Sequence, residues 1–100
     1  MNKIDEYRAV ISTYKALVRV AKTLHTLDEK SCNGYADTDW GRKAEVRDNT
    51  RTKNLLKKAQ ELASYLGMYA YHQGDPRGCS LYLVENLDAS TNYTNGIAIY

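Results

Sequence analysis

Apolar side chains in the N-terminal third of the chain recur at the spacing of an amphipathic helix. Between Lys3 and Lys30 they return every three or four positions, with no intervening Pro or Gly. They are Ile4, Tyr7, Val10, Ile11, Tyr14, Leu17, Val18, Ala21 and Leu24. Asn33 or Gly34 can then take the left-handed conformation that ends a helix. The pattern predicts one long helix from Lys3 to about Lys30 that packs along this stripe.

A second helix is predicted to begin at Thr38 or Asp39, either of which can cap it, and to end near Leu66 with Gly67 as its C-terminal cap. Its second half carries an apolar stripe made of Leu55, Leu56, Ala59, Leu62, Ala63 and Leu66. Residues 40–54 carry few apolar side chains. That half is either a solvated extension or a segment that a partner orders.

Residues 68–85 predict two strands joined by a tight turn at Asp75-Pro76-Arg77-Gly78. Asp75 can bond back to the chain, Pro76 presets φ, and Gly78 is expected in the left-handed position that ends a type I turn with a bulge. Because side chains alternate between faces, the register of the hairpin decides which residues face the core. The expected register pairs Tyr71 with Tyr82 and Ala70 with Leu83.

A short third strand is predicted over residues 96–100, after a polar loop at residues 86–95. The economical arrangement is an α+β fold and a single domain over residues 1–100, in which two N-terminal helices pack on one face of a small antiparallel sheet, in the order α-α-β-β-β. The face toward the helices is expected to carry Met68, Ala70, Leu81 and Leu83, with Ile97 and Ile99 able to join. The opposite face is expected to carry Tyr69, Tyr71, Tyr82 and Val84, with Tyr100 able to join.

The aromatic composition draws attention to that second face, because the chain has nine Tyr, one Trp and no Phe. Tyr joins a ring to a polar tip and suits surfaces that contact something else. Tyr69, Tyr71 and Tyr82 are therefore candidate binding residues. They could stack nucleobases, form a protein-binding patch, or simply stabilise the hairpin through cross-strand pairs.

The formal net charge of +2 argues against a strong general nucleic-acid binder, but the charge is unevenly distributed. Residues 42–58 hold seven Lys or Arg against two acidic residues. Arg47 and Arg51 share a helix face there with Asn54 and Lys58, which suits a phosphate group, an acidic protein surface or plain solvation. Arg77, at the tip of the turn, is a further candidate.

The sequence offers little sign of catalysis or of a cofactor. His72 and Cys79 flank a turn without a third group to orient them, and no phosphate-binding loop, carboxylate pair or metal-ligand spacing is present. We therefore expect a protein that is not an enzyme and holds no cofactor or metal. With no apolar run of about 20 residues, no signal-peptide pattern and only two Cys, we expect no membrane partner and a cytoplasmic location with reduced thiols.

The string Gly-Asp-Pro-Arg-Gly-Cys-Ser-Leu-Tyr-Leu at residues 74–83, preceded by Cys32-Asn33-Gly34, resembles a widespread group of small phage and prophage proteins. Those proteins are similar in having a Cys-Asn segment after a first helix, a charged second helix and a strand–Asp-Pro-Arg-Gly–strand hairpin. Most have no assigned function, so the resemblance implies a phage accessory gene rather than a chemistry. Asn33, Arg77 and Tyr82 are the matching positions of interest.

Small phage proteins without catalytic residues usually act by binding. The leading hypothesis is an accessory protein that binds a host complex, such as a CRISPR effector or another defence system, and blocks it sterically in the host cytoplasm. The alternative is a nucleic-acid or nucleotide binder in which Tyr69, Tyr71 and Tyr82 stack bases while Arg47, Arg51 and Arg77 hold phosphates. A homodimer that uses the Tyr face is a third hypothesis.

Overall fold

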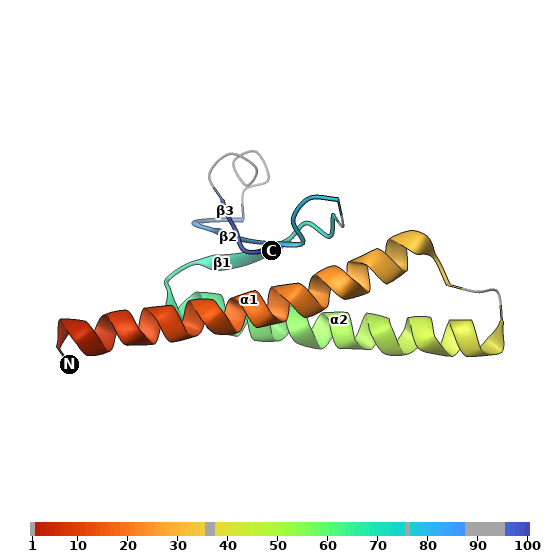
Figure 1. Ribbon diagram of the computed structural model, residues 1–100, viewed down its shortest axis with the longest axis horizontal. Helices are drawn as coiled ribbons and strands as arrows, with labels where there is room; N and C mark the ends of the chain where they lie inside the picture. Colours follow the sequence, from red (N-terminus) through yellow and green to blue (C-terminus); the bar gives the residue numbers. More distant parts are fainter. Residues whose placement is uncertain (1, 36–37, 76, 88–95) are drawn as a thin grey trace.

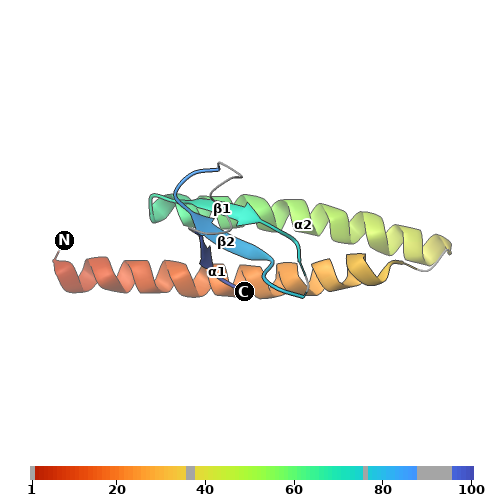
Figure 2. The same cartoon turned by 90° about the horizontal axis from the view of Figure 1, so that it is seen from above.

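The computed structural model describes residues 2–35, 38–75, 77–87 and 96–100. Two long helices, α1 (Lys3–Asn33) and α2 (Asp39–Tyr65), lie side by side and carry a small sheet across one side (Figures 1 and 2). The sheet has the order β1-β2-β3, with both pairs antiparallel. Its strands are β1 (Tyr69–His72), β2 (Leu81–Val84) and β3 (Ile97–Ala98). This confirms the predicted α+β arrangement and its element order.

Both helices begin and end at residues whose chemistry suits a cap. The Thr38 hydroxyl accepts the Gly41 N–H at 3.1 Å and starts α2. Gly34, with φ of 79°, and Gly67, with φ of 69°, follow the two helices in the left-handed half of conformational space, as predicted. The weakly apolar first half of α2 is helical, because small or polar residues at helical spacing face inward there. These buried residues are Gly41, Ala44 and Asp48.

The hairpin has the predicted register, with Tyr71 opposite Tyr82 and Ala70 opposite Leu83. Within the turn, the Asp75 carbonyl accepts the Gly78 N–H at 3.2 Å and the Asp75 carboxylate accepts the Arg77 N–H at 2.9 Å. Pro76 lies outside the described residues.

One detail of the turn prediction is wrong. The left-handed glycine of the hairpin is Gly74, with φ of 71°, and not Gly78. Gln73 and Gly74 both donate their N–H groups to the Ser80 carbonyl, at 2.9 and 3.3 Å. Two residues therefore oppose one, so the bulge lies before the turn rather than after it.

The core lies between the helices and the inner face of the sheet. Leu81 and Leu83 of the central strand are 0% and 2% exposed, which confirms the face to which they were assigned. Met68 and Ala70 are partly buried against the same cluster. The buried cluster consists of Leu17, Ala21, Leu24, Ala59, Leu62, Ala63, Leu81, Leu83 and Ile99. Ile97 lies opposite Leu83 but remains 51% exposed.

Two residues expected on the open face of the sheet behave differently. Val84 lies opposite Tyr69 as predicted, yet it is only 2% exposed. Tyr100 turns toward α1, where its ring meets the His25 ring edge-on at 5.2 Å and the Lys22 ammonium lies 5.7 Å from its centre. The open face therefore carries Tyr69, Tyr71 and Tyr82 without Tyr100.

The apolar stripe of α1 is only half buried, contrary to the expectation that it packs throughout. The buried positions of the helix are Leu17, Ala21, Leu24 and Leu27, whereas every residue from Asn2 to Ser12 is exposed. A helix of 31 residues is about 46 Å long. A strand of four residues reaches only about 13 Å. The N-terminal turns of α1 consequently project past both the sheet and the end of α2 (Figures 1 and 2).

We predict that the two halves of the stripe differ sharply in their contribution to stability. Leu17→Ala should lower the free energy of unfolding by about 2–5 kcal/mol, because it leaves a cavity in the core. Ile4→Ala, at a position that is 62% exposed, should change it by less than about 0.5 kcal/mol. Urea unfolding followed by circular dichroism measures both values. A loss of several kcal/mol for Ile4→Ala would show that the N-terminal turns pack against the rest of the chain.

Candidate interaction surface

A broad apolar groove opens where α1 leaves the sheet. Its volume is about 930 Å³. One wall is α1, and the opposite side is formed by the end of α2 and by the inner face of the sheet at Leu83 and Ile97. The lining residues are Val10, Ile11, Tyr14, Lys15, Val18, Arg19, Tyr65, Leu66, Met68, Leu83 and Ile97. The two cations stand among nine apolar or aromatic side chains, so the groove favours an apolar ligand or protein surface.

The apolar surface continues beyond the groove along the projecting turns of α1. We call the five residues Ile4, Tyr7, Ile11, Tyr14 and Val18 the α1 strip. Their exposed fractions are 62%, 66%, 54% and 39% for the first four, and Val18 is partly buried. A run of large apolar side chains that water reaches is unusual on a monomer and typically marks an interaction site.

Basic residues border the α1 strip on one side. Arg8, Lys15 and Arg19 follow one another at steps of seven and four, so they share a face of the helix. With Ile11 and Ser12 they line a shallow hollow of about 290 Å³ next to the groove. Among the described residues, no carboxylate lies within 4.0 Å of these three cations.

Sequence reasoning missed this surface because it assigned the whole stripe of α1 to the core. Two signals could have revealed it. The predicted helix is far longer than the predicted strands, so they could not cover it. In addition, the residues of the α1 strip are spaced by three, four, three and four, which is the narrow seam of a helix that packs against another helix.

The three Tyr candidates of the sheet lie together on its open face. Tyr71 and Tyr82 form a directly opposed pair and are half-buried, while Tyr69 is 45% exposed. The neighbouring Val84 is buried. This arrangement fits a cross-strand aromatic pair that stabilises the hairpin, and it leaves Tyr69 as the most accessible ring. Whether these Tyr residues bind a ligand stays a prediction.

The two Arg candidates of α2 lie on its exposed surface. The Arg47 Nε donates to the Asp48 carboxylate at 3.4 Å. Arg51 borders a second hollow, of about 250 Å³, between the two helices. Lys22 and Lys30 of α1 line the same hollow, together with Thr23, Thr26 and Leu27. Three cations, Arg51, Lys22 and Lys30, therefore line this hollow, which suits an anionic group.

Asn33 and Arg77 occupy the ends of two different elements. Asn33 is the exposed last residue of α1, and Arg77 is exposed in the hairpin turn. Within the described ranges, no hydrogen bond or ion pair joins either residue to Arg47 or Arg51. The predicted binding residues thus form several separate groups rather than one site.

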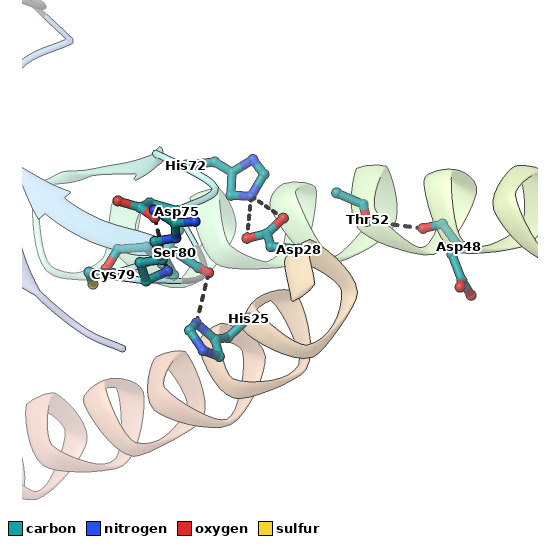
Figure 3. A network of polar contacts seen from close by, with 10 residues as sticks. His25, Asp28, Asp48, Thr52, His72, Asp75, Cys79 and Ser80 are labelled. Carbon is teal, nitrogen blue, oxygen red and sulfur yellow. Dashed lines mark hydrogen bonds and ion pairs between the residues drawn. The ribbon is translucent and has the colours of Figure 1, made fainter. Parts of the chain in front are cut away.

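A chain of polar contacts fastens the hairpin to α1 (Figure 3). The His25 Nδ1 lies 3.2 Å from the Ser80 hydroxyl, and its Nε2 lies 3.0 Å from the Glu29 carboxylate. An ionised carboxylate only accepts hydrogen bonds, so Nε2–H donates to Glu29, and the Ser80 hydroxyl is the partner of Nδ1. A Ser–His–Glu series is the composition of a nucleophilic site, but Ser80 is 0% exposed. A substrate has no access to that hydroxyl, so the contacts hold the hairpin in place.

A second contact supports the same junction. The His72 Nε2 lies 3.1 Å from both carboxylate oxygens of Asp28, where it donates a shared hydrogen bond. His72 and Asp28 are largely buried, with side chains 25% and 10% exposed. The Cys79 thiol, also buried, donates to the Leu81 carbonyl at 3.0 Å. His72 and Cys79, the pair that flanks the turn in the sequence, therefore have separate structural partners.

The far end of the helix pair is organised around Asp48, which is only 4% exposed. Its carboxylate accepts the Tyr35 hydroxyl at 3.1 Å and lies 3.9 Å from the Lys30 ammonium. Burial raises the pKa of Tyr35, and the hydrogen bond to Asp48 and that residue's negative charge add to the effect. Trp40, 76% exposed, lies beside this cluster.

Within the described part of the chain, no group of three or more His, Cys, Asp or Glu side chains could hold a metal ion. Neither helix combines the length and apolar character needed to cross a bilayer.

Comparisons of the chain with models of protein families, with curated proteins and with solved structures found no match. The resemblance of the hairpin string to small phage proteins therefore stays a prediction.

We predict that Ser80 is structural rather than reactive. Ser80→Ala should lower the free energy of unfolding by about 1–3 kcal/mol, because the His25 Nδ1 loses its hydrogen-bond partner in a largely buried place. The native protein should not be labelled by a fluorophosphonate serine probe, since the hydroxyl is buried. Urea unfolding and mass spectrometry measure the two effects. Labelling that Ser80→Ala abolishes would contradict this interpretation and indicate a nucleophile.

We further predict that Tyr35 loses its proton at a higher pH than a tyrosine of ordinary pKa. Because its pKa is raised in the folded state, the folded protein holds this proton more tightly than the unfolded chain, so stability from this group falls as the pH rises above about 10. An NMR titration of the Tyr Cζ resonances measures the order of ionisation. Asp48→Asn should lower the pKa of Tyr35 toward its ordinary value, whereas Asp39→Asn, at an exposed position, should not.

Proposed function

We propose that this protein acts by binding another protein, without turnover, and that the α1 strip with its adjoining groove is the contact surface. The observation that carries this proposal is the exposure of Ile4, Tyr7 and Ile11, which are 62%, 66% and 54% accessible. They lie on a helix that extends past the sheet and the end of α2 (Figures 1 and 2). Burying apolar surface contributes about 25 cal/mol per Å². An interface here would therefore gain free energy that the isolated chain leaves unused.

The composition of the surface supports a protein partner. Tyr7, Tyr14 and Tyr65 supply large amphipathic rings, which are enriched at the centres of protein interfaces. The cations Arg8, Lys15 and Arg19 follow one side of the α1 strip, where charged residues serve orientation and association rate. The surface also lies on a regular helix whose later turns are fixed in the core, so little ordering is needed on binding.

The biological setting of this proposal comes from the resemblance to small phage proteins. We infer an accessory protein that acts in the host cytoplasm and blocks a host complex, with a defence system such as a CRISPR effector as the leading class. A projecting helix suits steric inhibition, because it can occupy a groove that the complex needs for its own partner. Such inhibition requires stoichiometric binding and no chemical step.

A second candidate function is nucleic-acid or nucleotide binding. The observation in its favour is the hollow between the helices, where Lys22, Lys30 and Arg51 converge. Phosphate groups suit three cations in one place. Tyr69 on the sheet offers an accessible ring for stacking. This function predicts an affinity that falls steeply with salt concentration, whereas an apolar protein interface is less sensitive.

A tagged pull-down from bacterial lysate, with and without nuclease, tests the proposal. We expect the native protein to recover a stoichiometric host protein that survives nuclease and moderate salt. The double variant Tyr7→Ser/Ile11→Ser should lose that protein while its circular dichroism spectrum and unfolding midpoint stay unchanged, because both positions are exposed.

Val46→Ser is the matched control, since Val46 is an apolar residue of α2 that is 67% exposed. It should retain the partner. Capture that fails only in the variant Tyr71→Ser/Tyr82→Ser would move the interface to the open face of the sheet. Recovery of nucleic acid alone, lost on nuclease or salt, would favour the second function and contradict the first.

A further inference from the structure

The spacing of the α1 strip narrows the kind of partner that fits it. Ile4, Ile11 and Val18 alternate with Tyr7 and Tyr14 at steps of three and four, which are the a and d positions of a heptad pattern. The first set is β-branched throughout. From Ile4 to Val18 the strip runs along about 21 Å of helix. A straight apolar seam of this length matches the anchor side chains of another helix rather than a compact small molecule.

The two flanks of this seam differ in a way that matters for recognition. In the same heptad pattern, Arg8 and Lys15 occupy the e positions on one side. Both side chains are exposed and, among the described residues, neither has an acidic partner within 4.0 Å. The g positions on the other side are Val10 and Leu17, of which Leu17 is 0% exposed in the core. One flank is thus open and basic, and the other is apolar, exposed at Val10 (49%) and closed at Leu17 by the protein's own fold.

These flanks argue against a second copy of this chain as the occupant. An antiparallel pair of α1 helices sets e positions against e positions, so Arg8 and Lys15 would face the same cations of the other copy. A parallel pair sets e positions against g positions, which are the apolar Val10 and the buried Leu17, so Arg8 and Lys15 would meet no acidic side chain. Neither arrangement places an acidic side chain opposite Arg8 and Lys15.

We propose that the occupant of the α1 strip is an amphipathic helix of the partner protein, with large apolar residues at heptad spacing and Asp or Glu on the flank that meets Arg8 and Lys15. This inference rests on the proposed function and specifies its partner. The apolar seam supplies the binding free energy, and the acidic flank selects the partner and fixes its register.

Two synthetic peptides of about 21 residues, or three heptads, test the inference directly. Both carry Leu and Ile at the a and d positions. One has Glu at every e and g position and the other has Lys there, so like charges keep each peptide from pairing with itself. Fluorescence anisotropy gives the affinity, and NMR chemical-shift changes locate the contact on α1.

We expect the Glu peptide to bind at the α1 strip, and the Lys peptide to bind at least about tenfold more weakly. The charge-reversal variant Arg8→Glu/Lys15→Glu should invert this order. The matched control Lys53→Glu/Lys57→Glu, which makes the same change at exposed positions of α2, should leave it unchanged. Equal affinity for the two peptides, no binding of the Glu peptide, or a dimer of the native protein in light scattering would each overturn the inference.

The outcome is separable from that of the pull-down. A host protein that Tyr7→Ser/Ile11→Ser loses but Arg8→Glu/Lys15→Glu retains would leave the proposed function standing and refute the acidic helix. Competition of the Glu peptide with the captured host protein would support both.

Discussion

The inward side chains of the central strand, Leu81 and Leu83, are the point at which the helices and the sheet meet. Both are buried in one cluster with Leu17 and Leu24 of α1 and Leu62 of α2. Two helices that touch only each other would leave part of their apolar stripes exposed to water, and three short strands would leave one apolar face exposed. Packing of the central strand against both helices buries these apolar surfaces together. Loss of these contacts would therefore separate the layers rather than loosen a single element.

That arrangement also limits how much of the molecule can be covered. The strands are short, so the core extends along α1 only from about Leu17 to Leu27. Upstream turns keep the apolar pattern, yet among the described residues nothing covers Ile4, Tyr7 and Ile11, which are more than half exposed. The two halves of α1 thus have different roles. Its later turns are fixed by the core, and its earlier turns, which continue from them, present apolar side chains to solvent. Preorganisation of this kind reduces the entropy lost on association.

Polar contacts complement the apolar core at the junction between the hairpin and α1. His25 with Ser80, and His72 with Asp28, join residues that lie 55 and 44 positions apart in the chain. Directional bonds fix orientation, which burial alone does not. They explain why chemistry-bearing residue types gather here without forming an open site, since the Ser80 hydroxyl and the Cys79 thiol are committed to internal partners.

Much of the fold follows from local features of the sequence. Helical spacing predicts α1 and α2, the caps at Thr38, Gly34 and Gly67 predict their ends, and the alternation around the turn predicts the register of β1 and β2. These features are local because a helix or hairpin forms bonds between residues close in the chain. The bulge at Gly74 escaped prediction, since the hydrogen bonds of Ser80, rather than local propensity, decide it.

The candidate surface could be predicted only in part. Sequence alone determined that residues 3–30 form one amphipathic helix, because the spacing of apolar side chains is sufficient for that. Only the tertiary structure decided which half of the stripe is core and which half faces water. That division depends on the length of the sheet and on where it lies along α1, and both arise from contacts between residues far apart in the chain. The same long-range packing buried Ser80 and Val84, and turned Tyr100 toward His25.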